Sequence, residues 1–164
     1  MQHFNYLFVP PPGGGMERNM NEIMNEIIYY ENSLLAEDLC FLQEVVGFGQ
    51  ANLMQADKAI KNSLFCVSAK VNGQIAGMGR VIGDGARIFY LQDVFIAPDY
   101  QRMGIGKEIV ARMMKYINDN AFEQASTTVG LLAAKGKEDF YSKLGFQLRP
   151  NNGEGHGMIY RITK

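Results

Sequence analysis

Residues 90–121 constrain the fold more than any other part of the chain. They read YLQDVFIAPDYQRMGIGKEIVARMMKYINDNA. The first seven residues are rich in aromatic and β-branched side chains and are followed by Ala97 and Pro98, which predicts a strand that ends there. From Ile105 onward, apolar residues recur every three or four positions, which predicts an amphipathic helix. This stretch therefore predicts a strand, a short loop and a helix in direct succession.

The loop between this strand and helix, QRMGIG at 101–106, contains two glycines where the helix begins. Glycine has no Cβ, so its backbone can approach a ligand closely, and the first turn of a helix presents N–H groups without intrahelical partners. Together with the positive end of the helix dipole, those N–H groups favour an anion such as a phosphate. The sequence therefore predicts a phosphate site at this turn.

Two familiar phosphate loops do not fit this turn. A P-loop ends in Gly-Lys-Ser/Thr, whereas Lys107 is followed by Glu108, so the magnesium-binding hydroxyl is missing. A dinucleotide-binding fingerprint needs a third glycine, and the register set by Gly104 and Gly106 places Ile109 at that position. The predicted phosphate site therefore belongs to another class.

The arrangement resembles the GNAT family of acyl-CoA-dependent N-acetyltransferases. The family signature is Gln/Arg-x-x-Gly-x-Gly/Ala after a strand that ends in a hydrophobic-x-Pro step. Gln101, Gly104 and Gly106 match the signature, and residues 96–98 supply the step. A second match is FYSKLGF at 140–146, which corresponds to the family's Phe-Tyr-x-Lys-x-Gly-Phe sequence beside the thioester. The resemblance covers roughly residues 25–164.

The resemblance implies an enzyme that transfers acetyl from acetyl-CoA to a primary amine of a small molecule or peptide by direct attack. Tyr141 falls on the family's general acid. A tyrosine hydroxyl has a pKa of about 10 and a thiol one of about 8.5, so a neutral tyrosine can donate toward the departing thiolate. The alternative is that Tyr141 only packs beneath the last strands. Asp93 is the candidate general base, with a structural hydrogen-bonding role weighed equally and water as another proton acceptor.

The implied cofactor-binding residues lie at the end of the strand and on the glycine turn. Free backbone groups of the strand would pair with the pantetheine arm, and N–H groups of the turn would meet the pyrophosphate. These residues are Val94, Phe95, Ile96, Gln101, Arg102, Met103, Gly104, Ile105, Gly106 and Lys107. For the side chains of Arg102 and Lys107, an ordinary solvated helix start is the alternative to a phosphate contact.

Periodicity and turn signals predict the α/β (α+β) class for the whole chain. The GNAT-like form of that class is a mixed, mostly antiparallel central sheet of six to seven strands, flanked by about four helices. Asn72 and Gly73 form the strongest hairpin signal, between strands expected at 64–71 and 74–82. Beyond the signature helix we expect a strand at 127–133, a helix at 137–144, and two final strands near Phe146 and at 158–162.

Residues 1–22 are expected to be a flexible tail or linker, because PPPGGG at 10–15 has a linker composition. The sequence does not decide whether this segment is native or a cloning remnant. Residues 23–164 form the expected GNAT-like domain, and a chain of 164 residues fits one such unit.

Charge and cysteine content limit the class of partner. The formal net charge of -1 argues against a nucleic-acid binder. Cys40 and Cys66 share no metal-ligand spacing with His3 and His156, so we expect no metal and two free, buried thiols. No apolar run approaches the length of a membrane span. We therefore expect a cytoplasmic protein without nucleic-acid or membrane partners, and leave open whether it forms a homodimer.

Two other functions stay open at this point. The chain could be a CoA-binding sensor or regulatory domain that has lost the chemistry, or an acetyltransferase that acts on a macromolecule. Tyr141 favours the enzyme over the sensor, and the near-neutral charge gives the macromolecular substrate no support. The motifs fix neither the acyl acceptor nor the general base.

Overall fold

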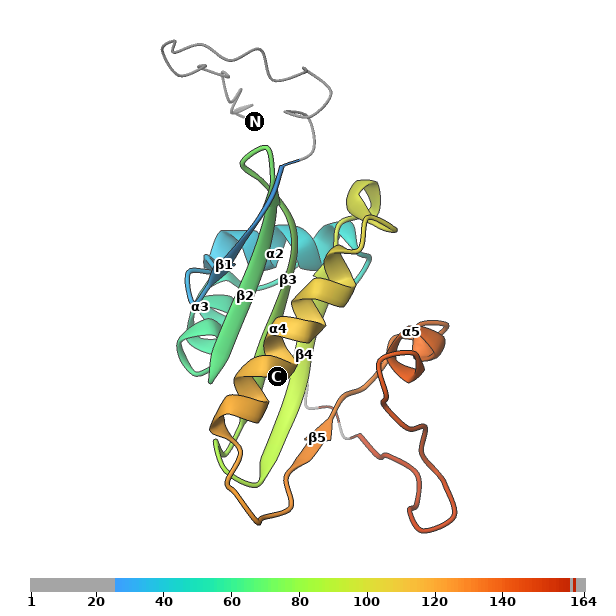
Figure 1. Ribbon diagram of the computed structural model, residues 1–164. Helices are drawn as coiled ribbons and strands as arrows, with labels where there is room; N and C mark the ends of the chain where they lie inside the picture. Colours follow the sequence, from blue (N-terminus) through green and yellow to red (C-terminus); the bar gives the residue numbers. More distant parts are fainter. Residues whose placement is uncertain (1–25, 160, 162–164) are drawn as a thin grey trace.

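The centre of the fold is a five-stranded sheet in the order β1-β2-β3-β4-β5 (Figure 1). The structure is a computed structural model that describes residues 26–159 and 161. Strands β1 to β4 pair with one another in antiparallel fashion, and β5 runs parallel to β4. The strands are β1 (Ile27–Glu31), β2 (Phe65–Val71), β3 (Gln74–Gly83), β4 (Ile88–Ile96) and β5 (Thr128–Gly130). The predicted mixed, mostly antiparallel sheet is confirmed.

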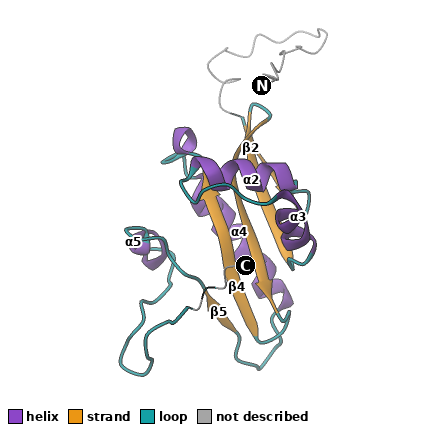
Figure 2. Cartoon of the chain, turned by 180° about the vertical axis from the view of Figure 1, so that it is seen from behind, coloured by secondary structure: helices purple, strands orange, loops and turns teal. Residues whose placement is uncertain are grey.

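Helices cover both faces of this sheet. Helix α4 (Ile105–Asn120) packs against β2, β3 and β4, and α2 (Ala36–Val45) packs against β3 and β4 from the other side. Helix α3 (Leu53–Lys61) packs against α2, as the two opposite views show (Figures 1 and 2). A 3-10 turn, η1 (Pro98–Tyr100), and a short helix, α5 (Glu138–Ser142), follow β4 and β5 respectively. The described residues thus contain four α-helices, as predicted.

The glycines of β3 let α4 approach the sheet closely. A Cβ on Gly79 would lie 2.6 Å from Met113 Sδ and 2.8 Å from Ile109 Cγ2, closer than real Cβ atoms come to other atoms. Met113 and Ile109 are buried in the same core as the apolar face of β2. That face is formed by Phe65, Val67, Ala69 and Val71, which alternate along the strand with its period of two.

Strand β4 changes faces in its middle. Leu91 belongs to the core beneath α4, and by simple alternation Phe95 would do the same. Instead Val94 packs against that core, and Phe95 is buried on the α2 side. The register with β3 shifts at this point, and Asp93 has a left-handed φ of 50°. One extra residue in β4 therefore forms a β-bulge, which reverses the alternation.

The carboxy-terminal part has fewer strands than the six to seven expected for the sheet. Strand β5 is three residues long instead of covering 127–133, and the described residues around Phe146 form no strand. The strand expected at 158–162 lies partly outside the described residues. Residues 151–157 read NNGEGHG, a glycine- and asparagine-rich composition that disfavours strands, and Asn151 and Glu154 pair within a tight turn. The expected tail at 1–22 also lies outside the described residues.

Candidate active site

Strands β4 and β5 are paired only along the first three residues of β4. The paired residues are Ile88 with Thr128, Phe89 with Val129, and Tyr90 with Gly130. Strand β4 continues to Ile96, whereas the chain leaves the sheet after β5 and runs toward α5 (Figure 1). The second half of β4 therefore has no β5 neighbour.

The backbone groups of Val94 and Ile96 point to this open edge. The N–H of Ala97 donates to the carbonyl of Ala76 on β3 at 2.9 Å, and successive residues of a strand direct their backbone groups to opposite sides. Ile96 and Val94 therefore direct theirs away from β3. In agreement, the Ile96 carbonyl accepts a hydrogen bond from Gln101 Nε2 at 3.2 Å. That bond fastens the glycine turn to the end of the open edge.

The glycine turn carries this edge to the start of α4. Gly104 precedes the helix with a φ of 82°, and Arg102 is also left-handed, with a φ of 66°. The first helical bond runs from the Glu108 N–H to the Gly104 carbonyl at 3.1 Å. The amides of residues 105–107 thus come before the hydrogen-bond ladder of the helix and lie at the positive end of its dipole. The turn therefore offers the free amides that an anion site needs, and phosphate binding there stays a prediction.

Gly106 faces the space between β4 and α5. A Cβ at this position would lie 3.5 Å from Ile96 Cγ1 and 3.5 Å from Phe140 Cζ. These are ordinary van der Waals distances, so alanine fits, whereas a larger side chain would extend into the space between these elements. The fold thus brings together the end of β4, the glycine turn and the FYSKLGF motif, which are far apart in the sequence.

Tyr141 lies on α5 and packs against the core beneath α4. Its ring makes edge contacts with Phe140 and Phe146, at centroid distances of 4.9 and 6.0 Å. The N–H groups of Phe146 and Gly145 donate to the carbonyls of Tyr141 and Ser142, which is the bond pattern of a Schellman motif and returns Phe146 to the tyrosine. Burial raises the pKa of the Tyr141 hydroxyl, so the group is protonated at neutral pH.

Asp93 is held in the bulge by Arg80 of β3. Arg80 Nε and Nη2 donate to Asp93 Oδ2 at 2.9 and 2.7 Å, and Gln92 Nε2 donates to Oδ1 at 2.7 Å. Arg80 Nη1 also donates to the Ala59 carbonyl and to Ser63 Oγ, which ties the pair to α3 and the residues after it. These contacts support the structural alternative for Asp93, and its role as general base stays a prediction.

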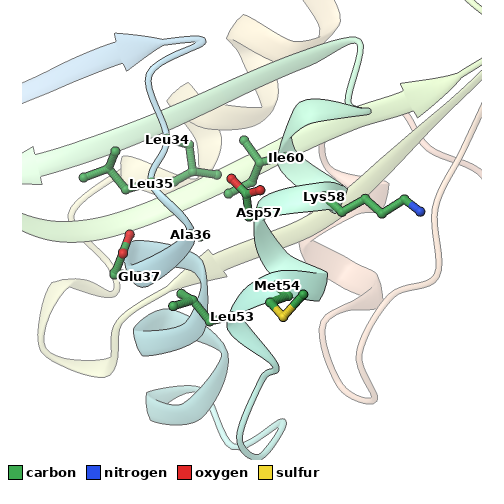
Figure 3. A pocket seen from close by; sticks show the side chains of 9 residues that line it. All are labelled: Leu34, Leu35, Ala36, Glu37, Leu53, Met54, Asp57, Lys58 and Ile60. Carbon is green, nitrogen blue, oxygen red and sulfur yellow. The ribbon is translucent and has the colours of Figure 1, made fainter. Parts of the chain in front are cut away.

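A hollow of about 580 Å³ lies between the start of α2 and α3 (Figure 3). None of the site residues predicted from the sequence lines it. Its lining residues are Leu34, Leu35, Ala36, Glu37, Leu53, Met54, Asp57, Lys58 and Ile60. In the described residues no group of three or more side chains could hold a metal ion, and no helix is long and apolar enough to cross a membrane. Cys40 and Cys66 are free thiols, and Cys66 is buried as expected, whereas Cys40 is only half-buried.

Sequence reasoning missed Arg80 and Gln92. Arg80 had a signal, because a charged residue inside the apolar stretch QIAGMGRVIG needs a buried partner. Its partner Asp93 could not be assigned, because the β-bulge that turns Asp93 toward Arg80 contains no glycine that would have indicated a bulge in the sequence. Gln92 had no signal, since its position beside Asp93 matters only once the register between β3 and β4 is known.

The sequence profile of the Acetyltransferase (GNAT) domain matches residues 37–160, which is most of the chain. The chain belongs to the GNAT acetyltransferase family. The family predicted from the two motifs is thus confirmed, and so is the fold class.

Relatives of this GNAT chain are named as N-acetyltransferases. It is 28% identical over 123 residues to the uncharacterized N-acetyltransferase ycf52 of Pyropia yezoensis, covering 73% of this chain and 67% of that protein. It is 25% identical over 162 residues to GCN5-related N-acetyltransferase 2, chloroplastic, of Arabidopsis thaliana, covering 85% of this chain and 61% of the relative. The chain therefore spans about two thirds or less of the length of these proteins.

Solved GNAT structures match the described fold. A protein of unknown function from Staphylococcus aureus, described as a probable acetyltransferase, is 30% identical with a TM-score of 0.73, covering 82% of this chain and 100% of that one. The aminoglycoside N-acetyltransferase AAC(6')-Iy, solved in complex with CoA, has a TM-score of 0.60, covering 85% of this chain and 96% of its own. At 13% identity the second likeness shows the fold alone.

Proposed function

We propose that this GNAT chain transfers acetyl from acetyl-CoA to a primary amine of a small molecule or peptide, by direct attack of the amine on the thioester. The observation that carries the proposal is the open edge of β4, which leads directly to the amides that begin α4. This arrangement offers strand-like hydrogen bonds first and an anion site next, in the order in which CoA presents its amide-containing pantetheine arm and its pyrophosphate.

The residues present fit such a ligand. Val94 and Ile96 supply backbone groups that can pair with the pantetheine amides as an added strand would. The amides of residues 105–107 can donate to the pyrophosphate, and a hydrogen bond to a charged group contributes about 1.5–3 kcal/mol. Gly106 keeps the space beside Ile96 and Phe140 free of a side chain. Arg102 and Lys107 are exposed at the same turn and add positive charge there.

The chemical step needs an unprotonated amine and a proton for the leaving group. The nitrogen lone pair forms the new C–N bond, the C–S bond breaks, and its electron pair leaves on the CoA sulfur. Tyr141 donates its hydroxyl proton to that thiolate, and its raised pKa keeps the proton on the tyrosine until the thiolate forms. The proton lost by the nitrogen goes to Asp93 or to water, the two acceptors that the sequence leaves open.

Calorimetric titration with acetyl-CoA and an acetylation screen test the proposal. The screen covers amines, polyamines, amino acids and peptides, and it detects the release of free CoA. We expect acetyl-CoA to bind and at least one amine to be acetylated. Absence of acetyl-CoA binding would overturn the proposal. Binding without transfer to any of these amines would favour the CoA-binding sensor instead. The cytoplasmic location and the absence of metal, nucleic-acid and membrane partners stay predictions.

A further inference from the structure

Gln92 occupies a special position on β4. It is the Cα partner of Arg80 across the β3–β4 ladder, and paired residues of an antiparallel sheet project their side chains from the same face. Arg80 reaches Ala59 and Ser63, so this is the α3 face, opposite α4. The last β5 pair is formed at Tyr90. Gln92 is therefore the first residue on the α3 face of β4 after the two strands have parted.

The side-chain amide of Gln92 has a fixed orientation. Its Nε2 lies 2.7 Å from Asp93 Oδ1, and a carboxylate accepts hydrogen bonds but does not donate them. The NH₂ group must therefore face Asp93, and Gln92 Oε1 must point away from it. Asp93 itself is held by two bonds from Arg80. No hydrogen bond to Gln92 Oε1 occurs within the described part of the chain, so this atom is an available, oriented acceptor.

We infer that Gln92 Oε1 receives an N–H of the acceptor amine, and that Arg80 and Asp93 act as positioning residues for it. The inference rests on the proposed function, because the open edge of β4 at Val94 is where the thioester would lie. A neutral primary amine carries two N–H groups, and its lone pair must face the thioester carbon. An acceptor atom fixed on the α3 face orients the nitrogen by binding one N–H, without removing the proton.

The position also separates the acceptor from the cofactor. The side chains of Val94 and Ile96 pack toward the α4 core, whereas Gln92 lies on the opposite face. An amine held by Gln92 would thus approach the strand edge from the α3 face, and the anion site lies at the start of α4. The two substrates would meet at the edge of β4 without competing for the same face.

A pair of CoA derivatives tests this inference before any natural acceptor is known. The first is S-carboxymethyl-CoA ethylamide, CoA–S–CH₂–CO–NH–C₂H₅, in which the N–H stands in for that of the acceptor amine. The second is the corresponding ethyl ester, which has the same shape and an oxygen in place of the N–H. Gln92→Met keeps the length of the side chain and removes the amide. Gln55→Met makes the same change at an exposed position on α3 and serves as the control.

We expect the wild-type protein and the Gln55→Met control to bind the ethylamide about five- to tenfold more tightly than the ester, as one hydrogen bond allows. In Gln92→Met the ratio should fall to about one, while the affinity for CoA itself stays unchanged. If CoA binds but the ethylamide-to-ester affinity ratio is equal in the wild-type protein and in Gln92→Met, the role of Gln92 is overturned while the proposed function stands. Failure of the wild-type protein to bind CoA would overturn the proposed function and this inference with it.

Discussion

Arg80 and Asp93 are joined across β3 and β4 by an ion pair of 2.7 Å, at the point where β4 changes faces. Their side chains are only 9% and 15% exposed, so water stabilises neither charge well. Each charge therefore depends on the other for its stabilisation. The remaining Arg80 nitrogen, Nη1, donates to the Ala59 carbonyl and to Ser63 Oγ. The pair therefore fixes the bulge that places Val94 at the open edge and Gln92 on the opposite face.

Removing one member of this pair should destabilise the fold strongly. We expect Asp93→Ala to lower the free energy of unfolding by roughly 3–5 kcal/mol, because it leaves the guanidinium of Arg80 buried and unpaired. The double variant Arg80→Met/Asp93→Ala should lose much less stability than the sum of the losses in Arg80→Met and Asp93→Ala. Urea unfolding of the four proteins measures the coupling. Additive effects would show that the pair is not what holds the bulge.

The close approach of α4 to β3 gives a second stability prediction. Gly79→Ala places a methyl group 2.6 Å from Met113 Sδ and 2.8 Å from Ile109 Cγ2, so one of the packed elements must shift. We expect a loss of about 1–3 kcal/mol in the free energy of unfolding. Gly153→Ala is the control, because nothing lies within 4 Å of its added Cβ. Equal stability of the two variants would contradict this account of the packing.

The sequence predicted those parts of the fold that depend on local patterns. The 3.6-residue period from Ile105, the hairpin at Asn72 and Gly73, and the alternation in β2 each specify one element and its buried face. The bulge at Asp93 was not predictable, because it depends on a side chain of β3 and no glycine marks the residue that adopts the positive φ. The final strands, expected near Phe146 and at 158–162, flank residues 151–157, whose glycine- and asparagine-rich composition disfavours strands.

The candidate site also has one part that the sequence predicts and one part that only the structure reveals. Gly104 marks the anion-binding turn in the sequence itself, because its left-handed φ of 82° favours glycine, and Gly106 leaves the start of the helix without a side chain. The contacts of Asp93 and Gln92 arise only when β3 and β4 are in register. A polar side chain whose partner lies on a neighbouring strand produces no recognisable pattern in the sequence. Its role can be identified only once the fold is known.

The cofactor site can be tested with two substitutions at Gly106. Alanine makes only ordinary contacts with Ile96 and Phe140, and it should leave acetyl-CoA affinity within a few-fold of wild type. Valine extends into the space between these residues, and it should weaken binding by at least about tenfold, or 1.4 kcal/mol. Both variants should melt at or above the wild-type temperature, because glycine is the weaker helix former. Unchanged calorimetric affinity in Gly106→Val would remove this turn from the cofactor site.

Tyr141 should matter when the thiolate leaves and hardly at all when acetyl-CoA binds. Tyr141→Phe keeps the ring and its contacts with Phe140 and Phe146 but removes the proton donor. With an acceptor from the screen, we expect kcat to fall by about 10²-fold or more, with cofactor affinity and melting temperature close to wild type. A loss of stability in step with activity would assign the hydroxyl a structural role.

The pH dependence of kcat gives a separate test of the same hydroxyl. A general acid works in its protonated form, so its contribution is present below its pKa and is lost as the pH rises through it. Burial raises the pKa of Tyr141 above the ordinary value of about 10, which moves this loss to higher pH. With a saturating acceptor, kcat should therefore show no decline due to this group between pH 7 and about 10, and Tyr141→Phe should lack any decline above that. A wild-type decline centred well below pH 10 that disappears in Tyr141→Phe would mean that the hydroxyl ionises too easily for its buried position.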